Sequence, residues 1–140
     1  MMEALYVESS ALAAILLEGN REFDAAFERR CARIMSSLTL LESRRVLRRA
    51  NLDGRVGPEG CARSLRRIEA LRGRSQILPI DEDVLREAEQ RFPVEPVRSL
   101  DAIHLATALI WSAAVGPVTV ASLDRRIRDN AVALGLTVVP

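Results

Sequence analysis

Four carboxylates in this chain stand at the ends of predicted strands or near the starts of predicted helices. They are Glu8, Glu42, Asp101 and Asp124. Asp101 is the clearest case, because Ser99 could cap a helix and apolar residues then recur close to helical spacing from Leu100 to Trp111. A charge in the first turn of a mostly buried helix is costly unless it caps the helix, pairs with another group or holds a metal ion.

These acids could share one site if the apolar segments form a parallel sheet. The carboxyl ends of parallel strands lie along one edge, where α/β proteins bind ligands. Carboxylates brought together repel one another and raise one another's pKa unless a cation neutralises them. An all-oxygen ligand set suits Mg²⁺ or Mn²⁺, which also contact substrate phosphates. Such a site can activate water and stabilise charge on a phosphodiester.

Each acid also has a simpler explanation. Thr39 and Glu42 fit a capping box, and Asp124 could be an N-cap. Asp101 could be a first-turn acid favoured by the helix dipole, and Glu8 could be a solvated strand terminus. The spacing of the residues leaves both interpretations open.

Short β-branched segments alternate with helical patterns along the chain. We predict strands over 4–7, 33–36, 75–79, 118–121 and 137–139. We predict helices over 9–18, from 20, over 39–50, over 58–73, from 81 to about 92, from 99, and over 124–134. Serines 9 and 10 could cap the first helix, and Gly19 could end it. This alternation predicts a single α/β domain over 1–140, with helices on a mainly parallel five-stranded sheet.

Composition excludes several classes of protein. The formal net charge is +1, so a global basic signature for nucleic acid is lacking. The start has no secretory pattern, the most apolar region is broken by Gly116 and Pro117, and the two cysteines have no metal spacing. We therefore expect a cytoplasmic protein without a membrane span. All basic residues are arginine, and we interpret most clusters as solvated helix faces, with a phosphate-binding rim as the alternative.

Known nucleotide-binding and hydrolase motifs are missing from the sequence. Neither GxGxxG nor GxxxxGK[ST] occurs. The one histidine, His104, has no nucleophile elbow near it. It shares a helix face with Asp101 and could border a site there, but we interpret it as a hydrogen-bonded core residue.

Four ordered segments resemble the PIN domain, and most closely the VapC-type toxins of bacterial toxin–antitoxin pairs. Residues 6–12 (YVESSAL) stand where the family has a strand ending in Asp-x-Ser-Ala, and 37–42 (SLTLLE) where it has a threonine-rich helix start with an acid. Residues 98–108 (RSLDAIHLATA) match Arg-x-x-Asp-Ala-x-x-Leu-Ala-x-Ala, the most specific motif. Residues 122–127 (SLDRRI) resemble Thr/Ser-x-Asp-x-x-Leu/Ile.

This resemblance implies a metal-dependent endoribonuclease with a flavodoxin-like sheet. It also implies RNA as substrate, a homodimer, and silencing by a cognate antitoxin. The implied metal ligands for Mg²⁺ or Mn²⁺ are Glu8, Glu42, Asp101 and Asp124. The implied supporting or substrate-binding residues are Ser9, Ser122, Arg98 and Asp129.

Position 8 departs from the family pattern, which has aspartate there as the central ligand. Glutamate adds a methylene, and Mg²⁺ demands near-ideal octahedral geometry. Two alternatives to the nuclease therefore stand. One is a degenerate PIN module that binds RNA or a protein without cutting, and the other is an unrelated α/β domain whose acids only cap helices.

Overall fold

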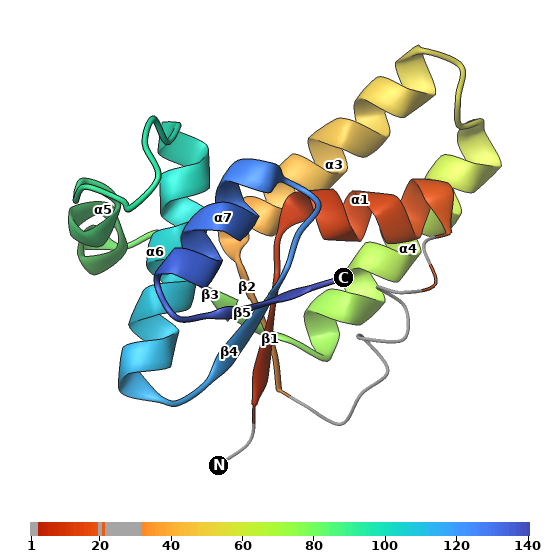
Figure 1. Ribbon diagram of the computed structural model, residues 1–140. Helices are drawn as coiled ribbons and strands as arrows, with labels where there is room; N and C mark the ends of the chain where they lie inside the picture. Colours follow the sequence, from red (N-terminus) through yellow and green to blue (C-terminus); the bar gives the residue numbers. More distant parts are fainter. Residues whose placement is uncertain (1–2, 20, 22–31) are drawn as a thin grey trace.

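A computed structural model describes residues 3–19, 21 and 32–140 (Figure 1). Its elements in chain order are β1 Ala4–Val7, α1 Ser9–Glu18, β2 Ala32–Ser36, α3 Ser37–Leu52, α4 Pro58–Gly73, β3 Gln76–Leu78, α5 Glu82–Ala88, α6 Ser99–Ala114, β4 Val118–Ala121, α7 Arg125–Ala133 and β5 Thr137–Val139. The five predicted strands are confirmed within one or two residues. The helix expected from residue 20, with Phe23 and Phe27, lies outside the described residues, as does Cys31.

The five strands form one all-parallel sheet in the order β3-β2-β1-β4-β5. β1 is the central strand, and it pairs with β2 on one side and β4 on the other. All four of its residues are buried, which is typical of a strand covered on both faces. The predicted α/β sandwich is therefore confirmed.

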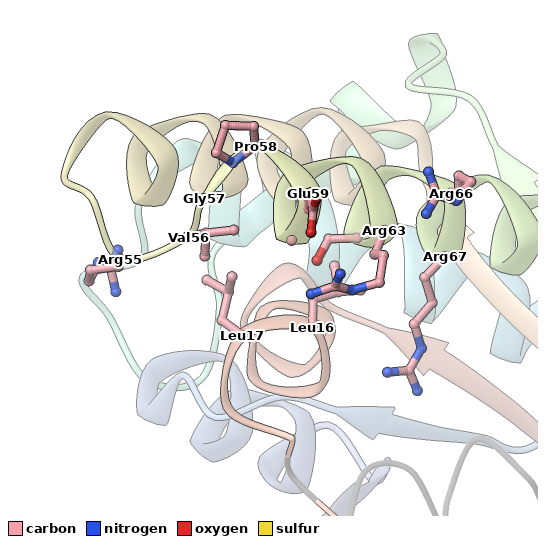
Figure 2. Close-up of a pocket in the computed structure, with 12 residues that line it drawn as sticks. Leu16, Leu17, Arg55, Val56, Gly57, Pro58, Glu59, Arg63, Arg66 and Arg67 are labelled. Atoms are coloured by element: carbon pink, nitrogen blue, oxygen red, sulfur yellow. The ribbon is translucent and has the colours of Figure 1, made fainter.

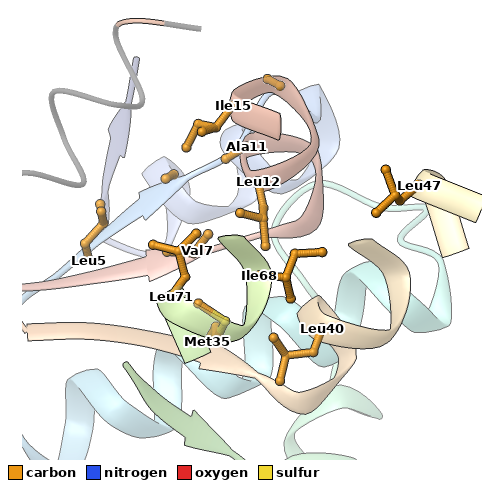
Figure 3. Close-up of a cluster of buried hydrophobic side chains, with 12 residues drawn as sticks. Leu5, Val7, Ala11, Leu12, Ile15, Met35, Leu40, Leu47, Ile68 and Leu71 are labelled. Atoms are coloured by element: carbon orange, nitrogen blue, oxygen red, sulfur yellow. The ribbon is translucent and has the colours of Figure 1, made fainter. Parts of the chain in front are cut away.

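Alternate residues of β1 belong to two hydrophobic clusters, one on each face of the sheet. Leu5 and Val7 pack in the cluster that α1, α3 and α4 cover, where Leu12 and Ile68 are fully buried (Figure 3). Ala4 and Tyr6 belong to the other cluster, which includes residues of α6 and α7. The helices of the first cluster and those of the second lie on opposite sides of the sheet in Figure 1.

The helix ends follow the expected chemistry with three corrections. Gly19 ends α1 in the left-handed conformation at φ 62°, and Pro58 opens α4. α1 is capped by the side chain of Glu8, not by a serine. α3 begins at Ser37 with Ser36 as its cap, so the predicted capping box at Thr39 is wrong.

The third correction concerns α6, which begins without a side-chain cap. Its N-cap is Arg98, and Ser99 is the first helical residue, so the predicted serine cap is wrong. Asp101 lies in the first turn, as predicted. None of the described helices is long and apolar enough to cross a lipid bilayer.

Candidate metal centre

The four predicted acids come from elements that meet at the carboxyl edge of the sheet. Glu8 follows β1 and Asp124 follows β4, and these two strands are neighbours. Glu42 stands on α3, which continues directly from β2 on the other side of β1. Asp101 is in the first turn of α6. The strand order therefore brings residues 8, 42 and 124 to one edge.

Glu8 is buried, with 6% of its surface exposed, and its carboxylate is already engaged in hydrogen bonds. Its Oε2 accepts from the Ser10 backbone N–H at 3.0 Å, from the Ser122 hydroxyl at 2.8 Å, and from the Ser10 hydroxyl. Ser122 Oγ also accepts from the backbone N–H of Asp124 at 3.0 Å. Ser122 thus connects the end of β1 to the start of α7.

Glu42 is held at one oxygen by two donors. Ser9 Oγ donates to Glu42 Oε1 at 2.6 Å, and His104 Nε2 lies 2.6 Å from the same oxygen. Burial by itself would raise the pKa of Glu42, but the hydrogen bonds from His104 and Ser9 outweigh it, and the pKa lies below its ordinary value. Glu42 is therefore a carboxylate at neutral pH.

Asp101 is affected by the other acids. Partial burial is the largest cause of its raised pKa, and the negative charges of Asp124, Glu8 and Glu42 raise it further, while His104 lowers it. Asp101 is thus close enough to the other three acids for their charges to affect it.

Asp124 and Asp129 both have structural partners. Asp124 caps α7, since its Oδ1 accepts from the Ile127 backbone N–H at 3.0 Å. Asp129 Oδ2 lies 3.7 Å from Arg125 Nε in an exposed ion pair. The helix-cap explanation of Asp124 is therefore correct, and it does not exclude a second role for the oxygen that does not cap.

An open groove of about 1070 Å³ runs along these acids. Its acidic lining residues are Glu42, Glu95, Asp101, Asp124 and Asp129, and its basic ones are Arg98, Arg125 and Arg126. The segment 94–100 forms one wall, while Glu8 does not reach the lining. A groove with carboxylates and guanidinium groups can hold a cation and a phosphate side by side.

The donor set fits a hard divalent cation. Ligand atoms of Glu8, Glu42 and His104 all lie within 4.8 Å of one another, and Asp101 and Asp124 add oxygens on the groove side. Both ring nitrogens of His104 already have hydrogen-bond partners, since Nδ1 lies 2.6 Å from the hydroxyl of Tyr6. The atoms that remain available to bind a metal ion are therefore carboxylate oxygens, which Mg²⁺ and Mn²⁺ prefer.

Sequence reasoning missed the contact between His104 and Glu42. The histidine is a buried core residue, with 1% of its surface exposed. Its Nδ1 contacts Tyr6 in the core, and its Nε2 contacts Glu42, which lines the groove. Its position three residues after Asp101, on the same helix face, was the available signal. Tyr6 carried no such signal, because its hydroxyl points to a partner 98 residues away in sequence.

A second hollow, of about 1110 Å³, lies where the end of α1 meets the turn into α4 (Figure 2). Leu16, Leu17 and Val56 contribute apolar surface, and the arginines that line it are Arg55, Arg63, Arg66 and Arg67. All four arginines are exposed. Their exposure agrees with our interpretation of the arginine clusters as solvated helix faces. None of the four predicted acids lines this hollow.

Known proteins of one family match nearly the whole length of this chain. The profile of the PIN domain family matches residues 5–133. Ribonuclease VapC35 of Mycobacterium tuberculosis (strain H37Rv) is 35% identical over 140 residues, covering 96% of this chain and 95% of that protein. Ribonuclease VapC46 of the same strain is 34% identical, with 99% and 98% covered.

Solved structures share the fold at low identity. FitAcB from Neisseria gonorrhoeae gives a TM-score of 0.70 at 19% identity, covering 97% of this chain and 96% of that one. The Mycobacterium tuberculosis toxin VapC20, described as cleaving the sarcin-ricin loop, gives 0.67 at 16%, with 95% and 96% covered. A toxin-antitoxin complex from Klebsiella pneumoniae gives 0.62 at 20%, with 98% and 96% covered.

Proposed function

The chain belongs to the PIN domain family, and we propose that it is a Mg²⁺- or Mn²⁺-dependent endoribonuclease, the toxin of a toxin–antitoxin pair. The observation that carries this proposal is the gathering of four acids at one edge of the sheet: Glu8 and Glu42 lie in one cluster, Glu42, Asp101 and Asp124 line one groove, and the charges of the other three acids raise the pKa of Asp101. Repulsion of this kind is relieved by a divalent ion. The relatives named ribonucleases, which match along nearly the full chain, support RNA as the substrate.

In this proposal Glu8, Glu42, Asp101 and Asp124 hold the ion. Once bound, the ion would activate a water molecule and neutralise the charge that develops on a phosphodiester. Ser9 fixes Glu42, and Ser122 ties Glu8 to the backbone of Asp124, so both serines keep carboxylates in place.

Groups at the groove would position the RNA. Arg98 lines the groove beside Asp101 and can bind a phosphate through its guanidinium group. Asp129 lines the same groove, and its pairing with Arg125 keeps that guanidinium near the acids. We assign both Arg98 and Asp129 to substrate binding.

The remaining partners are protein chains. The structural relatives include a toxin-antitoxin complex, which supports a cognate antitoxin as a partner of this chain. We further propose a homodimer in the cytoplasm.

One observation favours the degenerate module as a second candidate function. Glu8 Oε2 accepts three hydrogen bonds as a helix cap, and the residue does not reach the groove lining. A carboxylate used in this way could serve the fold alone. The chain would then bind RNA or a protein partner with little or no cleavage.

Calorimetric titration with Mn²⁺ tests the metal centre. We expect the parent protein to bind Mn²⁺. Loss of a residue that only hydrogen-bonds a metal ligand typically weakens metal affinity roughly 10- to 100-fold, and we expect Asp101→Asn to weaken Mn²⁺ binding by more than that. Asp83→Asn, an exposed acid-to-amide change on α5, is the matched control and should bind as the parent does. Equal binding by the parent and Asp101→Asn would reject the metal centre.

Incubation with labelled RNA separates the two candidate functions. The nuclease predicts Mn²⁺-dependent cleavage by the parent and none by Asp101→Asn. Cleavage by Glu8→Asp but not by the parent would instead identify an inactivated PIN domain.

A further inference from the structure

The groove is connected to the core of the molecule by a short hydrogen-bonded relay. Tyr6 OH lies 2.6 Å from His104 Nδ1, and His104 Nε2 lies 2.6 Å from Glu42 Oε1. Tyr6 has 0% of its surface exposed and His104 has 1%. The three side chains come from β1, α6 and α3, so the relay joins the central strand to two helices.

The chemistry of the two end groups determines which nitrogen of His104 carries the proton. Glu42 is a carboxylate, which can only accept, so the N–H must be at Nε2. Nδ1 then shares a hydrogen bond with the phenol hydroxyl of Tyr6. With a proton on Nε2, both nitrogens of His104 and the hydroxyl of Tyr6 have hydrogen-bond partners.

The relay leaves one oxygen of Glu42 for the groove. Ser9 Oγ, at 2.6 Å, and His104 Nε2 both bond Oε1. Among the described residues, Oε2 has no hydrogen-bond partner, while Glu42 lines the groove with Asp101 and Asp124. Two donors on one oxygen restrict the orientation of the carboxylate and leave Oε2 available to a ligand in the groove.

We propose that His104, oriented by Tyr6, is a positioning residue that aims Glu42 at the divalent ion. This inference rests on the proposed function, because it assigns a role within the same metal centre. His104 does not itself bind the ion, since both of its nitrogens are engaged. Its contribution is to keep Glu42 in one orientation before the ion arrives, which lowers the cost of ordering on binding.

Three variants test this role by Mn²⁺ calorimetry. His104→Leu removes both hydrogen bonds, and we expect the affinity for Mn²⁺ to fall roughly 10- to 100-fold. His104→Gln retains an N–H donor that can reach Glu42 Oε1, so it should recover part of the loss. Thr107→Val removes a buried hydroxyl one turn along the same helix, bonded to Ile103 O at 2.7 Å, and should leave the affinity unchanged.

Nitrogen-15 NMR of the unsubstituted, metal-free protein gives an independent readout. The imidazole of His104 should show a protonated Nε2, and Tyr6→Phe should shift the Nδ1 resonance. An unprotonated Nε2 would overturn the inference, and this measurement requires no substitution at His104.

The outcomes separate this inference from the proposed function. If the parent binds Mn²⁺ and His104→Leu binds it equally well, the positioning role is wrong and the metal centre stands. If the parent binds no Mn²⁺, the metal centre itself is rejected, and the positioning role falls with it.

Discussion

Glu8 both caps α1 and belongs to the cluster of possible metal ligands. As the N-cap of α1 it accepts from Ser10, and it also accepts from Ser122 on the neighbouring strand end. Its ligand atom nevertheless lies within 4.8 Å of those of Glu42 and His104. The extra methylene therefore does not exclude Glu8 from the cluster, but it leaves the carboxylate tied to the cap.

Glu8→Asp should raise Mn²⁺-dependent RNA cleavage. Aspartate is an equally good N-cap, so α1 should remain intact, while the carboxylate would sit closer to the position expected in the family. Misplacement of a reacting group by about 1 Å costs on the order of a hundredfold in rate, and a gain of that order is the upper limit. Initial rates at saturating Mn²⁺ measure it, and an equal or lower rate would indicate that the site is built for glutamate.

Residue spacing predicted the acids of the site but not their hydrogen bonds. Strand ends and helix starts are readable from apolar runs, so Glu8, Glu42, Asp101 and Asp124 could be placed at one edge. Which oxygen of Glu42 is held depends on Ser9 and His104, which are 33 and 62 residues away from it. Contacts over such separations depend on the packing of α1, α3 and α6, which the local pattern does not encode.

Two residues of α7 hold the groove wall in place. Asn130 is fully buried, and its Oδ1 accepts from Val94 N at 2.8 Å while its Nδ2 donates to Val94 O at 3.0 Å. Arg126 adds a hydrogen bond to Pro96 O at 2.5 Å. These bonds hold the segment between α5 and α6 against α7. The prolines of this segment predicted a break between helices, but not where the segment would lie.

Asn130→Ala should loosen this wall and destabilise the protein. A typical hydrogen bond contributes about 0.5–1.5 kcal/mol to the free energy of unfolding, and this variant loses the two bonds that Asn130 makes to Val94. Urea denaturation measures the loss, and hydrogen exchange should accelerate at the Val94 amide. Asn51→Ala, which removes an exposed bond to Val56 O, is the matched control and should cost less. Unchanged exchange at Val94 would show that other contacts hold the wall.

Repulsion among the acids at the carboxyl edge of the sheet lowers the stability of the folded molecule. Burial and the charges of Asp124, Glu8 and Glu42 raise the pKa of Asp101, whereas the pKa of Glu42 is lowered. The two acids therefore act on stability with opposite signs as pH changes. The clustered carboxylates of the proposed metal centre thus reduce the stability of the metal-free fold.

Metal-free Asp101→Asn should gain stability relative to the parent as pH rises. Because the folded pKa of Asp101 is raised, the folded state binds more protons than the unfolded chain, and stability is lost as pH rises through the folded pKa. Asparagine lacks this loss, and the effect of Glu42 is common to both proteins. Urea unfolding with a chelator, from about pH 3.5 to pH 7, spans the titration of aspartate. A difference that is constant with pH would contradict the raised pKa.

The strand order has a consequence for synthesis on the ribosome. β1 is made first, but its neighbour β4 and the acid Asp124 come more than a hundred residues later. A nascent chain that has not yet extruded residues 118–124 lacks both the strand that completes the centre of the sheet and the fourth carboxylate. The proposed nuclease would therefore stay inert while it is being translated, and the messenger that encodes it would not be exposed to a half-made enzyme.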